Sequence, residues 1–191
     1  MRATEKLAHV LTIVLIPLLA TCSGSDPTES DEPLVYSGPG MSRDDPAGIG
    51  QTVPVTITDF LILFGGTLQL TLIEVLSGDA ALAKIRSWHP QNQAPPSGRE
   101  YLLARFRVRV VRVDDCCSYY VTRDRFKAVD ANDNVYPAAD ALVGMTPELK
   151  KSIPTGDTYE GYASFLVDPN DRSTLAVFDR DYFHRRFFKL R

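Results

Sequence analysis

The sequence predicts an all-β fold, an antiparallel β-sandwich, for most of the 191 residues of this chain. From Val53 onward, apolar and polar residues alternate with a period of two, as they do in strands with one buried face. Several segments of this kind are short, and turn-forming residues separate them. Helix signals are weak. Two packed sheets are therefore the expected architecture.

The composition is that of a folded globular protein. Hydrophobic residues make up 44% of the chain, charged residues make up 24%, and the formal net charge is −3. This mild acidity argues against a nucleic-acid-binding protein, which would have a basic domain. Three cysteines are too few for a fold that is built on disulfides.

Residues 1–21 have the features of a signal peptide. Two basic residues, Arg2 and Lys6, precede an apolar run of about 14 residues. This run is shorter than a membrane-spanning helix, which needs roughly 20 residues. The run ends in Leu19-Ala20-Thr21-Cys22, which resembles the lipobox of bacterial lipoproteins. The resemblance implies cleavage before Cys22 and lipidation of that residue, so that lipid anchors the chain to a membrane of the cell envelope. Simple secretion is the alternative.

The next segment, residues 22–51, is expected to be a flexible acidic linker. From Ser23 to Pro33 it contains no aliphatic or aromatic residue, and from Ser23 to Gly50 it has six acidic residues against one base, Arg43. Such a stretch cannot bury enough apolar surface to offset the conformational entropy lost on folding. The β-sandwich domain is therefore expected to span residues 52–191.

The first strands of the domain are expected to form a hairpin. Val53–Ile57 alternates, and an apolar run from Phe60 to Phe64 is followed by Gly65-Gly66, a pair typical of hairpin turns. Leu68–Leu72 alternates again. The apolar phase then switches to Ile73, which predicts a β-bulge.

A long strand is expected from Leu102 to Val113, with a second bulge where the apolar phase flips at Val111. A short helix capped by Asp79 is expected over Ala80–Arg86, and a second helix start is indicated at Thr146-Pro147-Glu148. Further strands are expected at Arg125–Asp130, Tyr159–Val167, Thr174–Phe178 and Arg186–Leu190.

Several packing and turn motifs occur along the chain after the lipobox-like segment and the acidic linker: Gly50–Val53, Tyr101–Val113, Phe126–Asp130 with Tyr136, Ile153–Gly156 and Gly161–Phe165. Together they resemble a family of bacterial surface lipoproteins that carry a telokin-like, immunoglobulin-type domain of unknown function. The resemblance implies an immunoglobulin-like β-sandwich outside the membrane, and it implies no catalytic residue. The loop from Trp88 to Gly98 is longer than the family pattern needs.

No sequence motif for catalysis is present. The chain lacks the phosphate-binding glycine loops, the HExxH zinc motif and the GxSxG serine motif of common enzymes. After the signal peptide, the histidines are His89 and His184. We therefore expect no enzyme activity, catalytic residue, metal site or cofactor. The expected function is that of an extracytoplasmic binding or interaction module, whose partner is an envelope protein, a peptide or an anionic polymer.

Two surfaces are candidates for such binding. Arg105, Arg107 and Arg109 alternate with the apolar residues of the long strand, so their side chains would line one face about 7 Å apart. Such a row is suited to phosphate, carboxylate or an anionic wall polymer. The alternative is that the arginine row is a solvent-exposed face without a ligand, next to a neighbouring strand with acidic residues. The second candidate is the loop that begins with Trp88 and His89.

The adjacent cysteines Cys116 and Cys117 have no further cysteine to pair with if Cys22 is lipidated. Adjacent side chains on a strand point to opposite faces, so both cannot easily reach one metal ion. In an oxidising compartment the two are candidates for a vicinal disulfide within a turn. Free thiols and metal or intermolecular bonding stay open, and a thiol- or metal-handling envelope protein is the alternative function.

Overall fold

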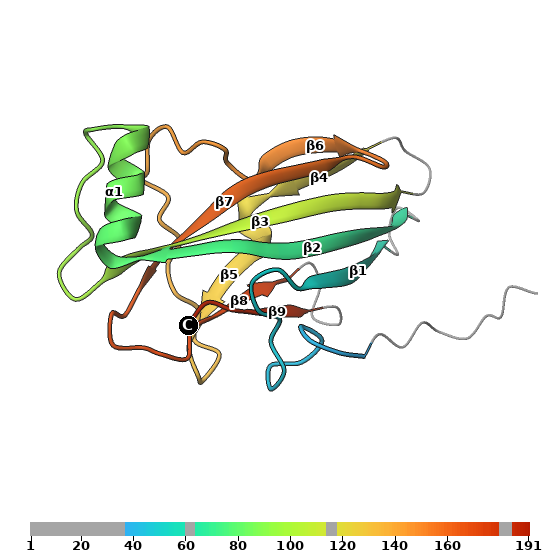
Figure 1. The fold of residues 1–191 in the computed structure, drawn as a ribbon, viewed down its shortest axis with the longest axis horizontal. Coiled ribbons are helices and arrows are strands. Elements are labelled where there is room, and N and C mark those ends of the chain that lie inside the picture. Colours follow the sequence, from blue (N-terminus) through green and yellow to red (C-terminus); the bar gives the residue numbers. More distant parts are fainter. Residues whose placement is uncertain (1–36, 60–63, 114–117, 180–184) are drawn as a thin grey trace, which may run out of the picture. The chain divides into compact units, whose positions relative to one another are not determined.

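The computed structural model describes residues 37–59, 64–113, 118–179 and 185–191 (Figure 1). The predicted signal peptide, Cys22, Cys116 and Cys117 lie outside the described residues. The described elements are β1 (Thr52–Asp59), β2 (Phe64–Ser77), α1 (Gly78–Trp88), β3 (Glu100–Val113), β4 (Ser118–Thr122), the 3₁₀ helix η1 (Arg123–Arg125), β5 (Phe126–Val129), β6 (Lys150–Pro154), β7 (Thr158–Val167), β8 (Leu175–Phe178) and β9 (Arg186–Lys189). No helix among the described residues is long and apolar enough to cross a membrane.

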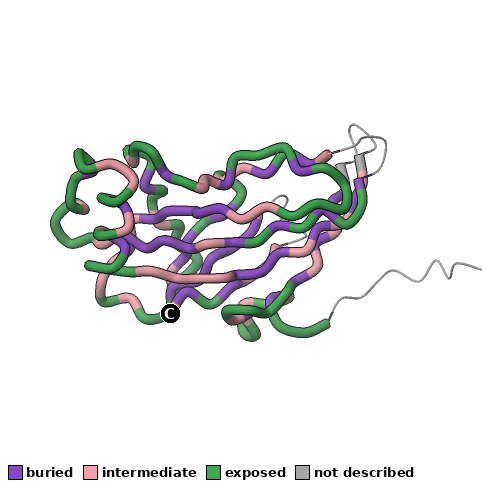
Figure 2. Tube along the Cα trace, turned by 45° about the horizontal axis from the view of Figure 1, so that its top comes forward, coloured by how far each residue is buried: buried purple, intermediate pink, exposed green. Residues whose placement is uncertain are grey.

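The predicted immunoglobulin-like antiparallel β-sandwich is confirmed. One sheet has the strand order β1-β2-β3-β7, the other has the order β5-β8-β9, and β4 pairs with β6 in a separate ribbon. The named strand pairs are all antiparallel. Figure 2 shows buried stretches that run along the strands of both main sheets. Side chains from both sheets therefore share one core, because each sheet needs a partner to cover its apolar face.

Four phenylalanines join the two main sheets at the centre of this core. The Phe106 ring on β3 lies 4.4 Å from the Phe126 ring on β5 and 5.2 Å from the Phe188 ring on β9. Phe126 in turn lies 5.1 Å from Phe178 on β8. These centroid distances are typical of attractive aromatic pairs, so Phe106 holds β3 directly to β5 and β9, and Phe126 extends the aromatic chain to β8.

Both predicted bulges are confirmed by the pairing of β2 with β3. The register shifts between Leu72 and Glu74, which leaves Ile73 as the extra residue on β2. It shifts again where Leu68 pairs with Val110 and Thr67 pairs with Arg112, which leaves Val111 as the extra residue on β3. Each extra residue reverses the facing of the residues after it, because side chains alternate along a strand.

The predicted turn at Gly65-Gly66 is wrong, because both glycines lie inside β2. Gly65 pairs with Thr58 and Gly66 pairs with Ile57, so the chain reverses before them, between Asp59 and Phe64. A Cβ atom on Gly66 would lie 2.6 Å from the carbonyl oxygen of Arg112. The glycine therefore allows β3 to approach closely beside its bulge, which is a common use of glycine within a strand.

The first helix prediction is confirmed and the second is wrong. Helix α1 covers Ala80–Arg86, but Ser77 is its N-cap residue, so Asp79 lies in the first turn instead of capping it. No helix begins at Thr146-Pro147-Glu148. The carbonyl group of Pro147 instead accepts a hydrogen bond from the Tyr162 backbone N–H at 2.9 Å, so this segment follows the edge of β7.

The last part of the predicted linker is packed on the domain. We call residues 37–51 the N-terminal strap. Ala47 on this strap is fully buried, and its N–H donates to the Phe187 carbonyl oxygen at 2.9 Å. Its own carbonyl oxygen accepts from the Lys189 N–H at 2.8 Å, and the Gly40 carbonyl oxygen accepts from Phe187. The strap thus covers the outer edge of β9, which would otherwise expose unpaired backbone groups.

Candidate binding face

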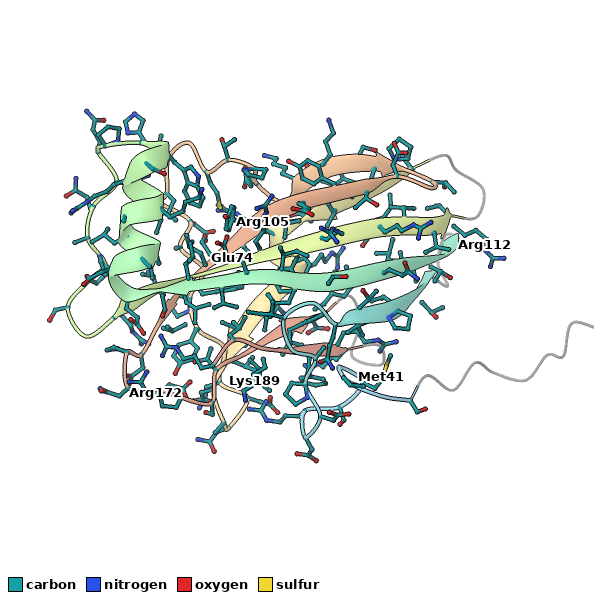
Figure 3. The ribbon with its side chains drawn as sticks, in the orientation of Figure 1. Met41, Glu74, Arg105, Arg112, Arg172 and Lys189 are labelled. Atoms are coloured by element: carbon teal, nitrogen blue, oxygen red, sulfur yellow. The ribbon has the colours of Figure 1, made fainter. Side chains whose placement is uncertain are left out.

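The outward side of the β2-β3-β7 sheet brings together the charged residues that the sequence analysis singled out. Helix α1 covers one end of this side, where Ala81 and Ile85 pack with Tyr101 and Leu103. Beyond the helix the side chains become polar (Figure 3). We call this polar region the arginine face, and it comprises Glu74, Arg105, Arg107, Arg109, Glu160 and Tyr162.

Strand register places these residues next to one another. Arg105 pairs with Glu74 on β2 and with Tyr162 on β7, and Arg107 pairs with Glu160. Directly paired residues share a face, so all of them project outward with the arginines. The bulge at Ile73 is essential for this arrangement, because it turns Glu74 to the same side as Arg105. Figure 3 shows Glu74 and Arg105 side by side on the sheet.

Glu160 binds two of the three arginines. Its Oε2 atom lies 2.7 Å from Nη2 of Arg105, and its Oε1 atom lies 2.7 Å from both Nε and Nη2 of Arg107. The alternative of an acidic strand opposite the arginine row therefore holds for these two residues. Their guanidinium groups are held in fixed positions, and the Arg107 side chain remains 50% exposed.

Arg109 differs from the other two arginines. It is exposed, and its register partners are the uncharged Gln69 and Thr158. Within the described part of the chain, no carboxylate lies within ion-pair distance of it. The arginine face thus has a neutralised end near α1 and an end with an available guanidinium group.

Tyr162 links the arginine face to helix α1. Its hydroxyl group donates to Oε2 of Glu74 at 2.7 Å, and its ring lies 5.9 Å from the Arg105 guanidinium and 5.7 Å from Nζ of Lys84. Burial and then the hydrogen bond to Glu74 raise the pKa of Tyr162 to about 12. The phenol therefore stays protonated at neutral pH and serves as a hydrogen-bond donor.

The predicted ligand loop is built into the protein's packing. Trp88 is half-buried, and its ring meets that of Tyr162 edge-on at 5.2 Å. The Nδ1 atom of His89 accepts a hydrogen bond from the Gln91 N–H at 3.3 Å. Asn92, which is 5% exposed, donates to the carbonyl oxygens of Ile85 and Val143 and accepts from the Val143 N–H. Trp88, the last residue of α1, therefore contacts the arginine face through Tyr162, while His89 bonds within its own loop.

Sequence reasoning missed Glu74, Glu160, Tyr162 and Asn92. The apolar phase switch after Leu72 was the available sign that Glu74 faces outward. No comparable sign marks the other three, since their roles depend on partners far along the chain. Among the described residues, no group of three His, Cys, Asp or Glu side chains could hold a metal ion.

We expect Tyr162 to make the protein sensitive to alkali. Its pKa is above the ordinary value of 10, so its contribution to stability is complete below about pH 10 and is lost as the pH rises through about 12. Denaturant unfolding between these pH values should show a falling free energy of unfolding. Tyr162→Phe should flatten part of that fall, and a curve identical to that of the parent would contradict this role.

Comparisons with known proteins identify a similar fold. No protein-family model matches the sequence, and no curated protein matches it. The yjhA protein of Bacillus subtilis superposes with a TM-score of 0.50 at 14% identity, over 76% of this chain and 99% of that one. MPT63, a secreted protein of Mycobacterium tuberculosis, has a TM-score of 0.47 at 15% identity, over 75% and 95% of the two chains. The similarity to yjhA supports the fold, and the family membership suggested by the sequence remains a prediction.

Proposed function

We propose that this protein is a lipid-anchored, extracytoplasmic binding module without catalytic activity, and that it holds an anionic polymer on the arginine face. The observation that carries the proposal is the row of guanidinium groups on β3, in which Glu160 fixes two members and Arg109 stays available. The lipobox-like Leu19–Cys22 supports the location, and it resembles the lipoprotein pattern also in following a short apolar run.

The geometry of the row favours an extended ligand with repeated charges. Arginines at alternate positions of one strand are spaced by about 7 Å, so successive anionic groups of a linear polymer can meet the available Arg109 and the half-exposed Arg107. Guanidinium groups bind phosphate and carboxylate through paired hydrogen bonds. Because Glu160 already orders Arg107, less side-chain entropy is lost there when a ligand binds.

The same residues give little support to acid–base catalysis. Guanidinium groups stay protonated throughout the physiological range. The pKa of Tyr162, about 12, likewise keeps its phenol neutral, so it is a poor base and a poor nucleophile at neutral pH. The arginine face therefore offers fixed positive charge and hydrogen-bond donors, which are the requirements for holding an anion.

The binding proposal is tested with Arg109→Gln, which removes the available charge. We expect the full chain in mild detergent to bind polyphosphate and polygalacturonate, and the variant to bind both about tenfold more weakly, because a charge-assisted hydrogen bond is lost. Arg172→Gln is the matched control, since Arg172 is also exposed but lies on the turn between β7 and β8 (Figure 3). If the two substitutions weaken binding equally, binding depends only on the net charge of the protein, and a specific site on the arginine face is contradicted.

A further variant in the same binding experiment distinguishes this proposal from a thiol- or metal-handling function. A variant with Cys116→Ser and Cys117→Ser should bind both polymers as the parent does. Dependence of polymer binding on the cysteine pair would instead favour the alternative function.

The anchoring proposal is tested with Cys22→Ser. We expect the parent to sediment with membranes and to carry the added mass of lipid, because Cys22 is the predicted acceptor. The variant should appear in the soluble extracytoplasmic fraction after export. Membrane retention and an unchanged mass in the variant would show that the attachment does not depend on Cys22.

A further inference from the structure

A cavity is lined by residues of β5, of β7 and of the segment between β5 and β6, and no residue of the arginine face belongs to its lining. Its volume is about 210 Å³. We call it the edge cavity. Its lining includes Arg123, Phe126, Val135, Tyr136, Ala138 and Phe165.

The apolar walls of the edge cavity are fixed by contacts behind them. Phe126 is held by Phe106 at 4.4 Å and by Phe178 at 5.1 Å between ring centroids. The Tyr136 hydroxyl group donates to Oδ2 of Asp171 at 3.0 Å. Walls held in this way do not need to rearrange when a ligand enters, which is the usual property of small-molecule sites.

A cation stands at the polar end of the same cavity. The Arg123 side chain is 21% exposed, and its Nη2 atom lies 3.1 Å from Oδ1 of Asp140. Its Nε atom lies 3.4 Å from Oε1 of Glu148. The Asp140 side chain is 70% exposed, so its contact with Arg123 competes with water and contributes little to stability.

Charge and shape together define what the cavity can accept. The Asp140 carboxylate binds Arg123 at the cavity rim, and it shows where the carboxylate of a ligand could bind the same guanidinium group. Releasing this exposed carboxylate to solvent costs little, so a ligand carboxylate can take its place. The other rim cation, Lys127, is directed toward Asp179 at 3.5 Å. Arg123 is therefore the charged group best placed for a ligand.

We propose that the edge cavity is a binding site for a small monocarboxylate with an apolar body. The carboxylate replaces Asp140 on Arg123, and the apolar body lies against Phe126, Phe165 and Val135. The cavity volume of about 210 Å³ is below the range of about 300–1,000 Å³ that is usual for drug-sized ligands. The cavity therefore accommodates a fragment of about ten non-hydrogen atoms, with a dissociation constant on the order of 1 mM. This site is separate from the proposed polymer-binding function.

The test is an amide NMR titration of the full chain in mild detergent with 3-phenylpropionate. We expect shift changes at the amides of Phe126, Val135 and Ser164, and a dissociation constant near the millimolar range. The neutral analogue 3-phenylpropionamide should bind at least about tenfold more weakly, because it lacks the charge that meets Arg123.

Two variants and one control complete the design. Arg123→Gln should weaken 3-phenylpropionate at least about tenfold, and Ala138→Leu should block binding by filling the cavity while Arg123 is kept. Arg109→Gln, on the arginine face, should bind the acid as the parent does. The proposal is overturned by equal binding of acid and amide, by unchanged binding in Ala138→Leu, or by the absence of localised shifts at concentrations tenfold above the expected constant.

Discussion

Replacing Phe106 with alanine is expected to lower the free energy of unfolding by about 3–5 kcal/mol, because the change removes a buried aromatic ring and leaves a cavity. Phe106 is fully buried and contacts Phe126 and Phe188 on the opposite sheet. Phe106 lies on β3, the strand that carries the three arginines. Its ring therefore joins this strand to the second sheet.

Urea unfolding followed by circular dichroism measures this loss. Phe187→Ala is the matched control, since Phe187 is only partly buried and packs on the small outer cluster of Val129, Leu175 and Val177. Its loss should be less than half that of Phe106→Ala. Equal losses in the two variants would mean that the aromatic chain between the sheets does not dominate the core.

Gly161→Ala is expected to have the second largest effect, at about 1–3 kcal/mol of lost stability, the usual range for overpacking. A Cβ atom at Gly161 would lie 2.7 Å from the backbone nitrogen of Leu149 and 2.8 Å from the carbonyl carbon of Glu148. Neither atom is the end of a flexible side chain, so β7 or the segment along its edge must move. Because Gly161 lies between Glu160 and Tyr162, this movement should also weaken polymer binding.

Gly48→Ala provides the comparison for the same chemical change. A Cβ atom there would lie 3.5 Å from the side-chain oxygen of Gln51, an ordinary contact distance. We expect the free energy of unfolding and the polymer affinity of this variant to be nearly those of the parent. A Gly161→Ala protein with parental stability would show that the edge of β7 is more yielding than its backbone contacts indicate.

The sequence predicts most of the strands because their burial follows a local pattern. Strands β1, β2, β3, β7, β8 and β9 alternate or form short apolar runs, and both bulges appear as phase switches. Strand β6 has one buried residue in five, so nothing local marks it. The strap is similar, because Ala47 packs into the main core where the strap pairs with β9, which lies 140 positions later at Phe187.

The arginine row is predictable and its environment is not. A spacing of two along an alternating strand suffices to place Arg105, Arg107 and Arg109 on one face. Which of them is neutralised depends on β3–β7 register, which brings Glu160 opposite Arg107 from 53 residues away. The predicted turn at Gly65-Gly66 was wrong for a related reason. Gly66 allows the close approach of β3, a strand that lies too far along the chain for a local turn pattern to reveal.

The most direct test of the polymer-binding function is to map where polyphosphate contacts the full chain by amide NMR in mild detergent. We expect shift changes to concentrate on the arginine face and its neighbours, at Arg107, Arg109, Gln69 and Thr158. In Arg109→Gln these changes should be much smaller at the same polymer concentration, because binding is about tenfold weaker. Changes confined to other cations, such as Lys150 and Lys151 on β6, or the same map in parent and variant, would contradict this function.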